Sequence, residues 1–193
     1  MALQNKLVNK FLGIFEGLTG YVGQISSDHA YIHKGQGFVV PLLTGSLSSG
    51  ATYKIAFTTP SAESGKYVHW RPSGGGGFSV GTSIETFEGS TSVSGGTDLT
   101  PLNKNRNIPV ASIMQSFKGG VTVGADGTRI QILSSGSAGS GSANQGGSGA
   151  SSLELVLKPD TVYTVTITNR SASTATLVGL ELWWYEEVGY TGE

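Results

Sequence analysis

Alternation of apolar and polar residues near the C-terminal end constrains the fold of this chain more than any other feature. In residues 162–168, tyrosine, valine and isoleucine alternate mainly with threonine, and in residues 180–185 leucine and tryptophan occupy every second position. Residues 153–157 carry leucine with the same period. Successive side chains of a strand point to opposite faces, so these segments indicate strands that bury one face and leave the other polar.

The rest of the chain from about residue 36 reads as further short strands between turns rich in Gly, Ser and Pro. Candidate segments are 37–40, 52–59, 67–70, 84–87, 110–117, 121–123 and 129–133. Pro41 should end the first of these or place it at a sheet edge. Asp126–Gly127 predicts a hairpin between the last two, because glycine adopts positive φ at little cost. About eight to ten such strands predict an all-β fold, a β-sandwich or jelly roll.

Composition narrows the function classes. Only 13% of the residues are charged, against roughly 25% in typical soluble domains, and 12 Lys and Arg nearly balance 13 Asp and Glu. We therefore expect no direct nucleic-acid binding, and no apolar run approaches the roughly 18 residues of a membrane span. The absence of cysteine excludes disulfides and thiolate sites. Residues 134–152, mostly Ser, Gly and Ala, predict a flexible surface loop or one ordered against a neighbouring subunit.

The N-terminal part follows a different pattern. Apolar residues recur there at three or four positions, with Leu7, Phe11 and Phe15 at the centre of the stripe. We predict an arm over residues 1–35, a short amphipathic helix plus linker that is helical or extended, and a β-sandwich domain over 36–193. The stripe needs a partner surface, because an isolated short helix is marginally stable. That partner is either the protein's own sheet or another chain.

A catalytic interpretation has little support. The chain contains no G-x-x-x-x-G-K-[ST] phosphate loop and no H-E-x-x-H zinc motif. Glu186 and Glu187 are both acidic, but neighbouring strand residues point to opposite faces and could not share a substrate. We therefore expect no enzyme and no cofactor.

Histidines offer the one potential metal spacing. His29 and His33 are four residues apart, which on a helix could place two imidazoles around a metal ion. The nearby Gly35 and Gly37 favour an extended segment instead, so we predict no metal site. His69 is expected to be a packed or hydrogen-bonded strand residue.

Tryptophans are the candidate contact residues. Trp183 and Trp184 should face opposite sides of one strand, so at most one of them lies in the core and the other marks an exposed contact. Trp183 is our candidate for a subunit contact. A sugar-stacking platform that includes Trp70 is the alternative. The polar run 103–107 could contact phosphate or sugar, but we expect a solvated turn there.

Five segments, in this order, carry a resemblance to a known group of proteins. They are Tyr31–Gly35, Tyr67–Pro72, Ser94–Thr97, Leu153–Pro159 and Trp184–Glu187. Together they resemble tailed-phage virion proteins of the capsid decoration or cement type, and the resemblance covers roughly residues 30 to 187.

The resemblance implies a β-sandwich, often a homotrimer, that binds the major capsid protein on a virion assembled in the host cytoplasm. Its function would be to clamp neighbouring capsid subunits against internal pressure, without chemistry. Leu7, Phe11, Phe15 and Trp183 are then the candidate contacts with the capsid or with other subunits. The alternative is a phage tail or fibre domain that recognises host glycans through Trp70 or Trp183.

Overall fold

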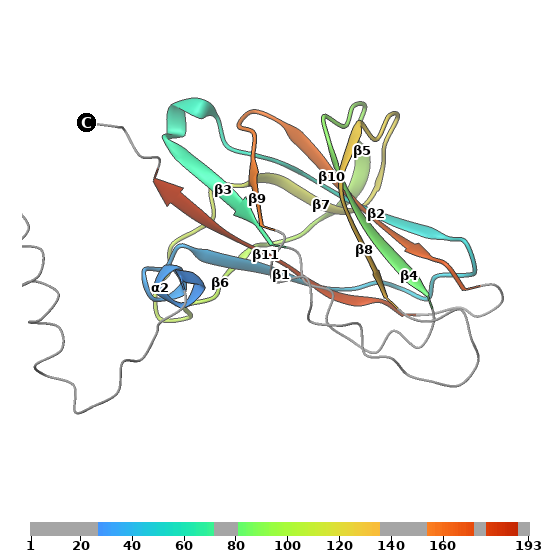
Figure 1. Ribbon diagram of the computed structural model, residues 1–193, viewed down its shortest axis with the longest axis horizontal. Helices are drawn as coiled ribbons and strands as arrows, with labels where there is room; N and C mark the ends of the chain where they lie inside the picture. Colours follow the sequence, from blue (N-terminus) through green and yellow to red (C-terminus); the bar gives the residue numbers. More distant parts are fainter. Residues whose placement is uncertain (1–26, 72–80, 136–153, 172–176, 189–193) are drawn as a thin grey trace, which may run out of the picture.

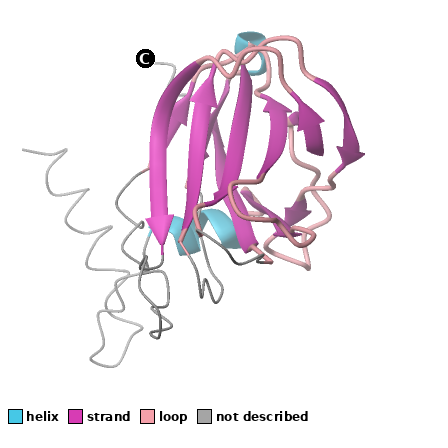
Figure 2. Ribbon diagram, turned by 90° about the vertical axis from the view of Figure 1, so that its right-hand side faces the viewer, coloured by secondary structure: helices cyan, strands magenta, loops and turns pink. Residues whose placement is uncertain are grey.

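Two antiparallel sheets packed face to face form the body of the protein in a computed structural model, which describes residues 27–71, 81–135, 154–171 and 177–188 (Figure 1). The first sheet contains, in spatial order, β6 (Leu102–Asn103), β1 (Gly37–Leu43), β11 (Gly179–Val188), β3 (Lys66–Trp70) and β9 (Leu155–Leu157). The second contains β5 (Ser94–Asp98), β7 (Gln115–Thr122), β2 (Thr52–Thr58), β10 (Val162–Asn169), β4 (Thr82–Glu88) and β8 (Thr128–Ser135). The short helices are α2 (Ser27–His33) and the 3₁₀ turn η1 (Ala62–Ser64) (Figure 2). The predicted all-β sandwich is confirmed.

The core lies between the two sheets and is rich in aromatic rings. The ring of Phe57 from β2 lies 4.8 Å from Trp70, 5.0 Å from Phe117 and 5.6 Å from Tyr163. Trp184 joins this cluster and is fully buried. Aromatic pairs at these separations stabilise a core beyond their buried area alone. The period-two pattern of the sequence thus correctly predicts which residues of β10 and β11 face the core.

The polar face of β10 is also buried, which the alternation alone does not predict. Thr164, Thr166 and Thr168 are 0%, 8% and 8% exposed. Thr166 is the cross-strand neighbour of Lys54, and the Lys54 ammonium donates to Asp126 Oδ1 at 2.6 Å. Asp126 belongs to the connection from β7 to β8, so this connection passes over the threonine face.

That connection corrects one sequence prediction. β7 and β8 follow each other in the chain, but β2, β10 and β4 separate them in the sheet. The hairpin predicted at Asp126–Gly127 is therefore wrong. Residues 123–127 instead cross the outer face of the six-stranded sheet, and Ala125 forms an isolated bridge with Thr91. Gly127 still supplies a positive φ of 84° at the end of the crossing.

The segment before β1 corrects a second prediction. Residues 27–33 form α2 rather than an extended strand. Its Tyr31 ring stacks on Tyr185 of β11 at 4.1 Å, so the helix lies against the outside of the five-stranded sheet. Pro41 behaves as expected: β6 pairs with β1 only at Phe38 and Val39, which leaves the β6 side of β1 unpaired at the proline.

Candidate functional site

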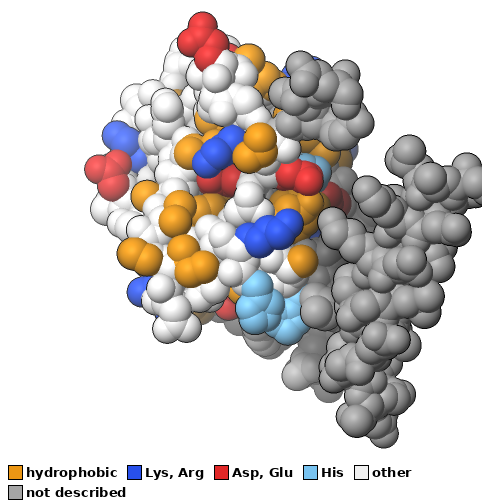
Figure 3. Space-filling view, turned by 90° about the vertical axis from the view of Figure 1, so that its left-hand side faces the viewer, with side chains coloured by type: hydrophobic (Ala, Val, Ile, Leu, Met, Phe, Trp, Pro, Cys, Tyr) orange, Lys and Arg blue, Asp and Glu red, His pale blue; other side chains and the backbone are white. Residues whose placement is uncertain are grey.

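The outer face of the five-stranded sheet, turned away from the core, carries an apolar patch. Its exposed members are Tyr67 (47% exposed), Leu102 (37%) and Val156 (57%). Val39 and Trp183, a cross-strand pair at the middle of the sheet, are half-buried between them. We call these five residues the outer patch. Figure 3 shows the molecule from the side on which α2 lies in Figure 1. Hydrophobic side chains alternate there with charged ones.

Trp183 lies at the centre of the outer patch and contacts two cations. Arg71, which follows β3 on one side of β11, lies 4.8 Å from the ring centroid. Lys104, which follows β6 on the other side, lies 4.6 Å from it. Both distances fall within the range of cation–π attraction. The prediction that one tryptophan of the pair lies in the core and the other outside it is confirmed, because Trp184 is fully buried and Trp183 is not.

A stack of three rings adjoins the outer patch. Tyr185 lies between Tyr31 at 4.1 Å and His69 at 4.4 Å. Glu154 accepts a hydrogen bond from the Tyr185 hydroxyl at 2.5 Å, and its Oε1 lies 2.7 Å from His69 Nδ1. Glu187 Oε2 lies 3.2 Å from the other ring nitrogen of His69. His69 is thus the hydrogen-bonded strand residue that the sequence predicts, held between two carboxylates.

These contacts shift the pKa values of the groups around His69. Burial raises the pKa of Glu154, but the hydrogen bonds from Tyr185 and His69 outweigh it and leave that pKa below its ordinary value. The hydrogen bond to Glu187 is the main cause that raises the pKa of Tyr31 to about 12. Glu154 therefore stays ionised and fixes the rings that border the outer patch.

Glu186 faces the opposite way, into the core, as the sequence predicts for the neighbour of Glu187. Its side chain is 3% exposed, and three donors converge on Oε1: the Ser112 hydroxyl at 2.5 Å, the Ile113 amide at 3.0 Å and Trp184 Nε1 at 3.1 Å. Burial raises the pKa of Glu186 despite these hydrogen bonds. This carboxylate ties the segment before β7 to the five-stranded sheet, which is a structural role.

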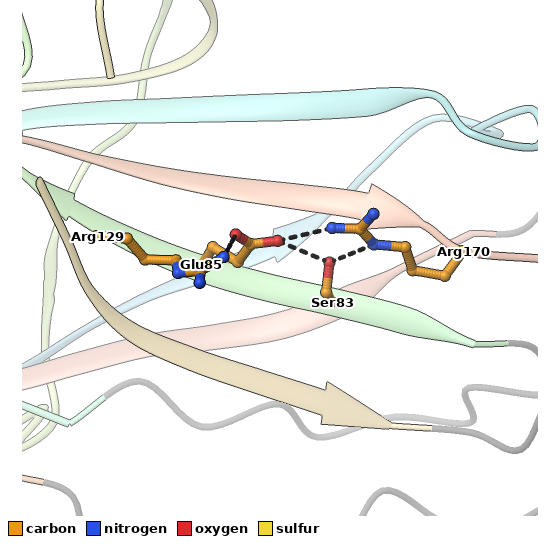
Figure 4. A network of polar contacts seen from close by, with 4 residues as sticks. All are labelled: Ser83, Glu85, Arg129 and Arg170. Atoms are coloured by element: carbon orange, nitrogen blue, oxygen red, sulfur yellow. Dashed lines mark hydrogen bonds and ion pairs between the residues drawn. The ribbon is translucent and has the colours of Figure 1, made fainter. Parts of the chain in front are cut away.

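A second polar cluster lies on the outer face of the six-stranded sheet (Figure 4). Glu85 Oε1 accepts from Arg170 at 2.8 Å and Oε2 from Arg129 at 3.0 Å, and Ser83 bonds both Glu85 and Arg170. Burial raises the pKa of Glu85, but the hydrogen bonds from the two arginines outweigh this effect and leave the pKa below its ordinary value. The cluster joins β4 to β8 and to the end of β10.

The two histidines of α2 and the polar run 103–107 are the remaining candidates from the sequence. His29 and His33 stack at 4.8 Å on α2, but the described residues contain no group of three side chains that could hold a metal ion. Within the polar run 103–107, Asn103 is buried, because its amide donates to the carbonyl oxygens of Gly35 and Val110. The prediction of a solvated turn is therefore wrong for Asn103.

Several predicted features lie outside the described residues. These are the stripe residues Leu7, Phe11 and Phe15 and most of the loop 134–152, whose first two residues end β8.

The chain also contains one G-x-S-x-G pattern, at residues 77–81. In α/β-hydrolases that pattern joins a strand to a helix, whereas here it falls between two strands of an antiparallel sandwich, and residues 77–80 are not described.

The sequence did not point to Arg71, Lys104 or Glu154 as members of this site. Each acts through a partner distant in the chain, and no local pattern marks such contacts.

In comparisons with known proteins, no family model, curated protein or solved structure matches the chain. Within the described ranges, no helix is both long and apolar enough to cross a membrane.

Proposed function

We propose that this chain is a non-enzymatic structural protein of a tailed-phage virion, which decorates the capsid and stabilises it by binding capsid subunits. The observation that carries the proposal is the outer patch, in which exposed apolar side chains and a half-buried tryptophan at the centre alternate with charged residues (Figure 3). Exposed apolar patches with polar rims are typical of protein–protein contacts, and tryptophan and arginine are enriched at their energetic centres. The resemblance of five segments to decoration proteins supplies the identity of the partner.

The contacts that hold the aromatic rings in place support docking of a preformed surface. Arg71 and Lys104 fix the Trp183 ring, and Glu154 fixes Tyr185 and His69 beside it. Side chains that are already held in place lose little conformational freedom when a partner binds. The proposed partners are the major capsid protein and further copies of this chain in a homotrimer. Sedimentation equilibrium measures the mass of such a trimer directly.

The alternative, glycan recognition through tryptophans, has less support. Trp70 is 0% exposed and cannot stack on an external sugar. Trp183 is contacted by cations from both neighbouring sides, so a pyranose ring would have to displace one of them. The geometry therefore favours a protein contact at Trp183.

A matched pair of variants tests the proposal on particles of the phage whose genome carries this sequence. Val156→Glu places a charge in the outer patch, and Ile132→Glu places one at a similarly exposed position of the other sheet, the two sites being 57% and 51% exposed. We expect Val156→Glu to weaken binding to undecorated capsids at least about tenfold, because a buried unpaired charge is costly at an interface. Ile132→Glu should bind as the wild type does. Equal binding by both variants would contradict the proposal.

A further inference from the structure

A pocket of about 390 Å³ lies on the other sheet, away from the outer patch. Val162 of β10 and Val93, just before β5, form its apolar part, and Thr58, Ser94, Ser116 and Lys118 contribute polar groups. Its volume falls within the range of roughly 300–1,000 Å³ that is usual for small-molecule sites. The pocket is built by β5, β7, β2 and the start of β10, so the sheet itself positions its polar residues.

A β-bulge shapes the pocket. Ala56 pairs with Lys118 and Thr58 with Gln115, so β7 has one residue more than β2 across this interval. Ser116, within the bulge, has a φ of 50°, in the left-handed region that L residues other than Asn and Asp rarely adopt. Bulges often occur beside binding sites, where they re-aim a side chain, and strained residues collect at such sites. Here the bulge places Ser116 on the wall of the pocket.

The polar groups of the pocket have spare hydrogen-bonding capacity. The hydroxyls of Thr58, Ser94 and Ser116 have no hydrogen-bond partner among the residues that the structure describes. The Lys118 ammonium lies 3.7 Å from Asp98, whose side chain is 86% exposed, so this ion pair is open to solvent. Three hydroxyls, one ammonium and a small apolar surface therefore converge on one cavity.

We propose that this pocket binds a monosaccharide that carries a single carboxylate. Hydroxyls that both donate and accept match the hydroxyls of a sugar, and the half-buried Val93 and Val162 match the apolar face of its ring. One lysine beside an aspartate suits a monoanion better than a phosphate dianion, which Asp98 would repel. The proposal is independent of capsid binding, because the pocket and the outer patch lie on different sheets.

An NMR titration of the full chain with D-glucuronate tests the proposal, with D-glucose and inorganic phosphate as the other arms. We expect saturable shifts of the backbone amide signals of Ser94, Ser116 and Lys118 with glucuronate. Glucose lacks the carboxylate and phosphate lacks the ring, so each should bind at least about tenfold more weakly. The absence of saturable shifts with glucuronate would overturn the proposal. Equal binding of glucose would refute the role of the charge, and equal binding of phosphate would refute the sugar.

Two variants separate binding from folding. Lys118→Gln removes the charge, and Lys34→Gln, just after the end of α2, is its control with the same change in net charge. Ser116→Gly removes the hydroxyl while glycine accepts the positive φ, so the fold should keep its thermal stability. We expect Lys118→Gln to lose about tenfold and Ser116→Gly several-fold in glucuronate affinity, with Lys34→Gln unchanged. Wild-type affinity in both pocket variants would overturn the assignment.

Discussion

Glu186 and Glu154, on opposite sides of the five-stranded sheet, differ in the way their surroundings set their ionisation. Glu186 is enclosed between the sheets, and burial raises its pKa although three donors point at one oxygen. Glu154 is partly open to solvent, and hydrogen bonds from Tyr185 and His69 overcome its desolvation and lower its pKa. The two residues should therefore affect folding stability in opposite directions as pH changes.

Glu186→Gln should become more stable relative to the wild type as pH rises. The raised pKa means that the folded protein holds this proton more tightly than the unfolded chain. The associated stability is complete below the ordinary pKa of glutamate and is lost as pH rises through the folded pKa. A glutamine keeps the oxygen that accepts from Ser112, Ile113 and Trp184, and it carries no charge. Urea unfolding at about pH 4 and about pH 8 measures the difference.

The comparison with Glu186→Ala separates charge from hydrogen bonding. Alanine leaves the buried donors of Ile113 and Trp184 without an acceptor, which should cost about 1–3 kcal/mol at either pH. A glutamine variant as unstable as the alanine variant at about pH 8 would show that the ionised form is required.

Glu154→Gln should lose stability only at neutral pH. The lowered pKa of Glu154 contributes stability above the ordinary glutamate pKa, and this contribution disappears as pH falls through the folded pKa. We expect a loss of at most about 1 kcal/mol at pH 7, because the contact between Glu154 and His69 is partly exposed. Thermal unfolding at about pH 7 and about pH 3 checks this, with the exposed Glu63→Gln as the control. A loss that persists at the lower pH would contradict it.

At the scale of elements, local pattern predicts the strands but not their connections. The alternation in β10 and β11 identifies both strands and their core faces, because period-two burial is a local property. The link from β7 to β8 resembles a hairpin turn locally, yet it crosses three strands to reach the far edge of the sheet. Contacts such as that of Lys54 with Asp126 join residues distant in the chain, and the sequence alone does not reveal them. The helix α2 was missed for a similar reason, since its stack of Tyr31 on Tyr185 is also long-range.

Gly127→Ala should destabilise the crossing of the outer sheet face. Gly127 has a φ of 84°, and an added Cβ would overlap the carbonyl oxygen of Glu88. The left-handed backbone alone costs about 1–2 kcal/mol for alanine, and the overlap adds to it. Gly45 has open space around it and no positive φ, so Gly45→Ala is the control and should be neutral or slightly stabilising. Chemical denaturation of both variants measures the effect, and equal midpoints would refute this account of the crossing.

At the scale of the whole molecule, the sequence anticipates part of the site. It singles out Trp183 as an external contact, because a strand cannot bury both of two adjacent tryptophans in one core. It does not reveal the cations on either side of that ring or the carboxylates around His69, which come from other strands and loops. The sheet topology brings together side chains that are distant in the sequence, so a site of this kind is visible only in the folded chain.

Deletion of residues 1–22 should weaken the proposed capsid binding without unfolding the sandwich. The deleted segment contains Leu7, Phe11 and Phe15, our sequence-based candidates for part of the contact, and the first described strand begins later, at Gly37. Circular dichroism should show an unchanged β spectrum and melting temperature, while co-sedimentation with undecorated capsids should decrease. Unchanged co-sedimentation would remove the N-terminal stripe from the proposed interface.

Electron cryo-microscopy of intact particles of the proposed phage tests the proposed capsid role most directly. We predict density for the two-sheet sandwich on the outside of the head, at symmetry-related positions, with the outer patch around Trp183 against a capsid subunit or a neighbouring copy. Location of the protein at the tail tip, or on the head with Trp183 facing solvent, would contradict it.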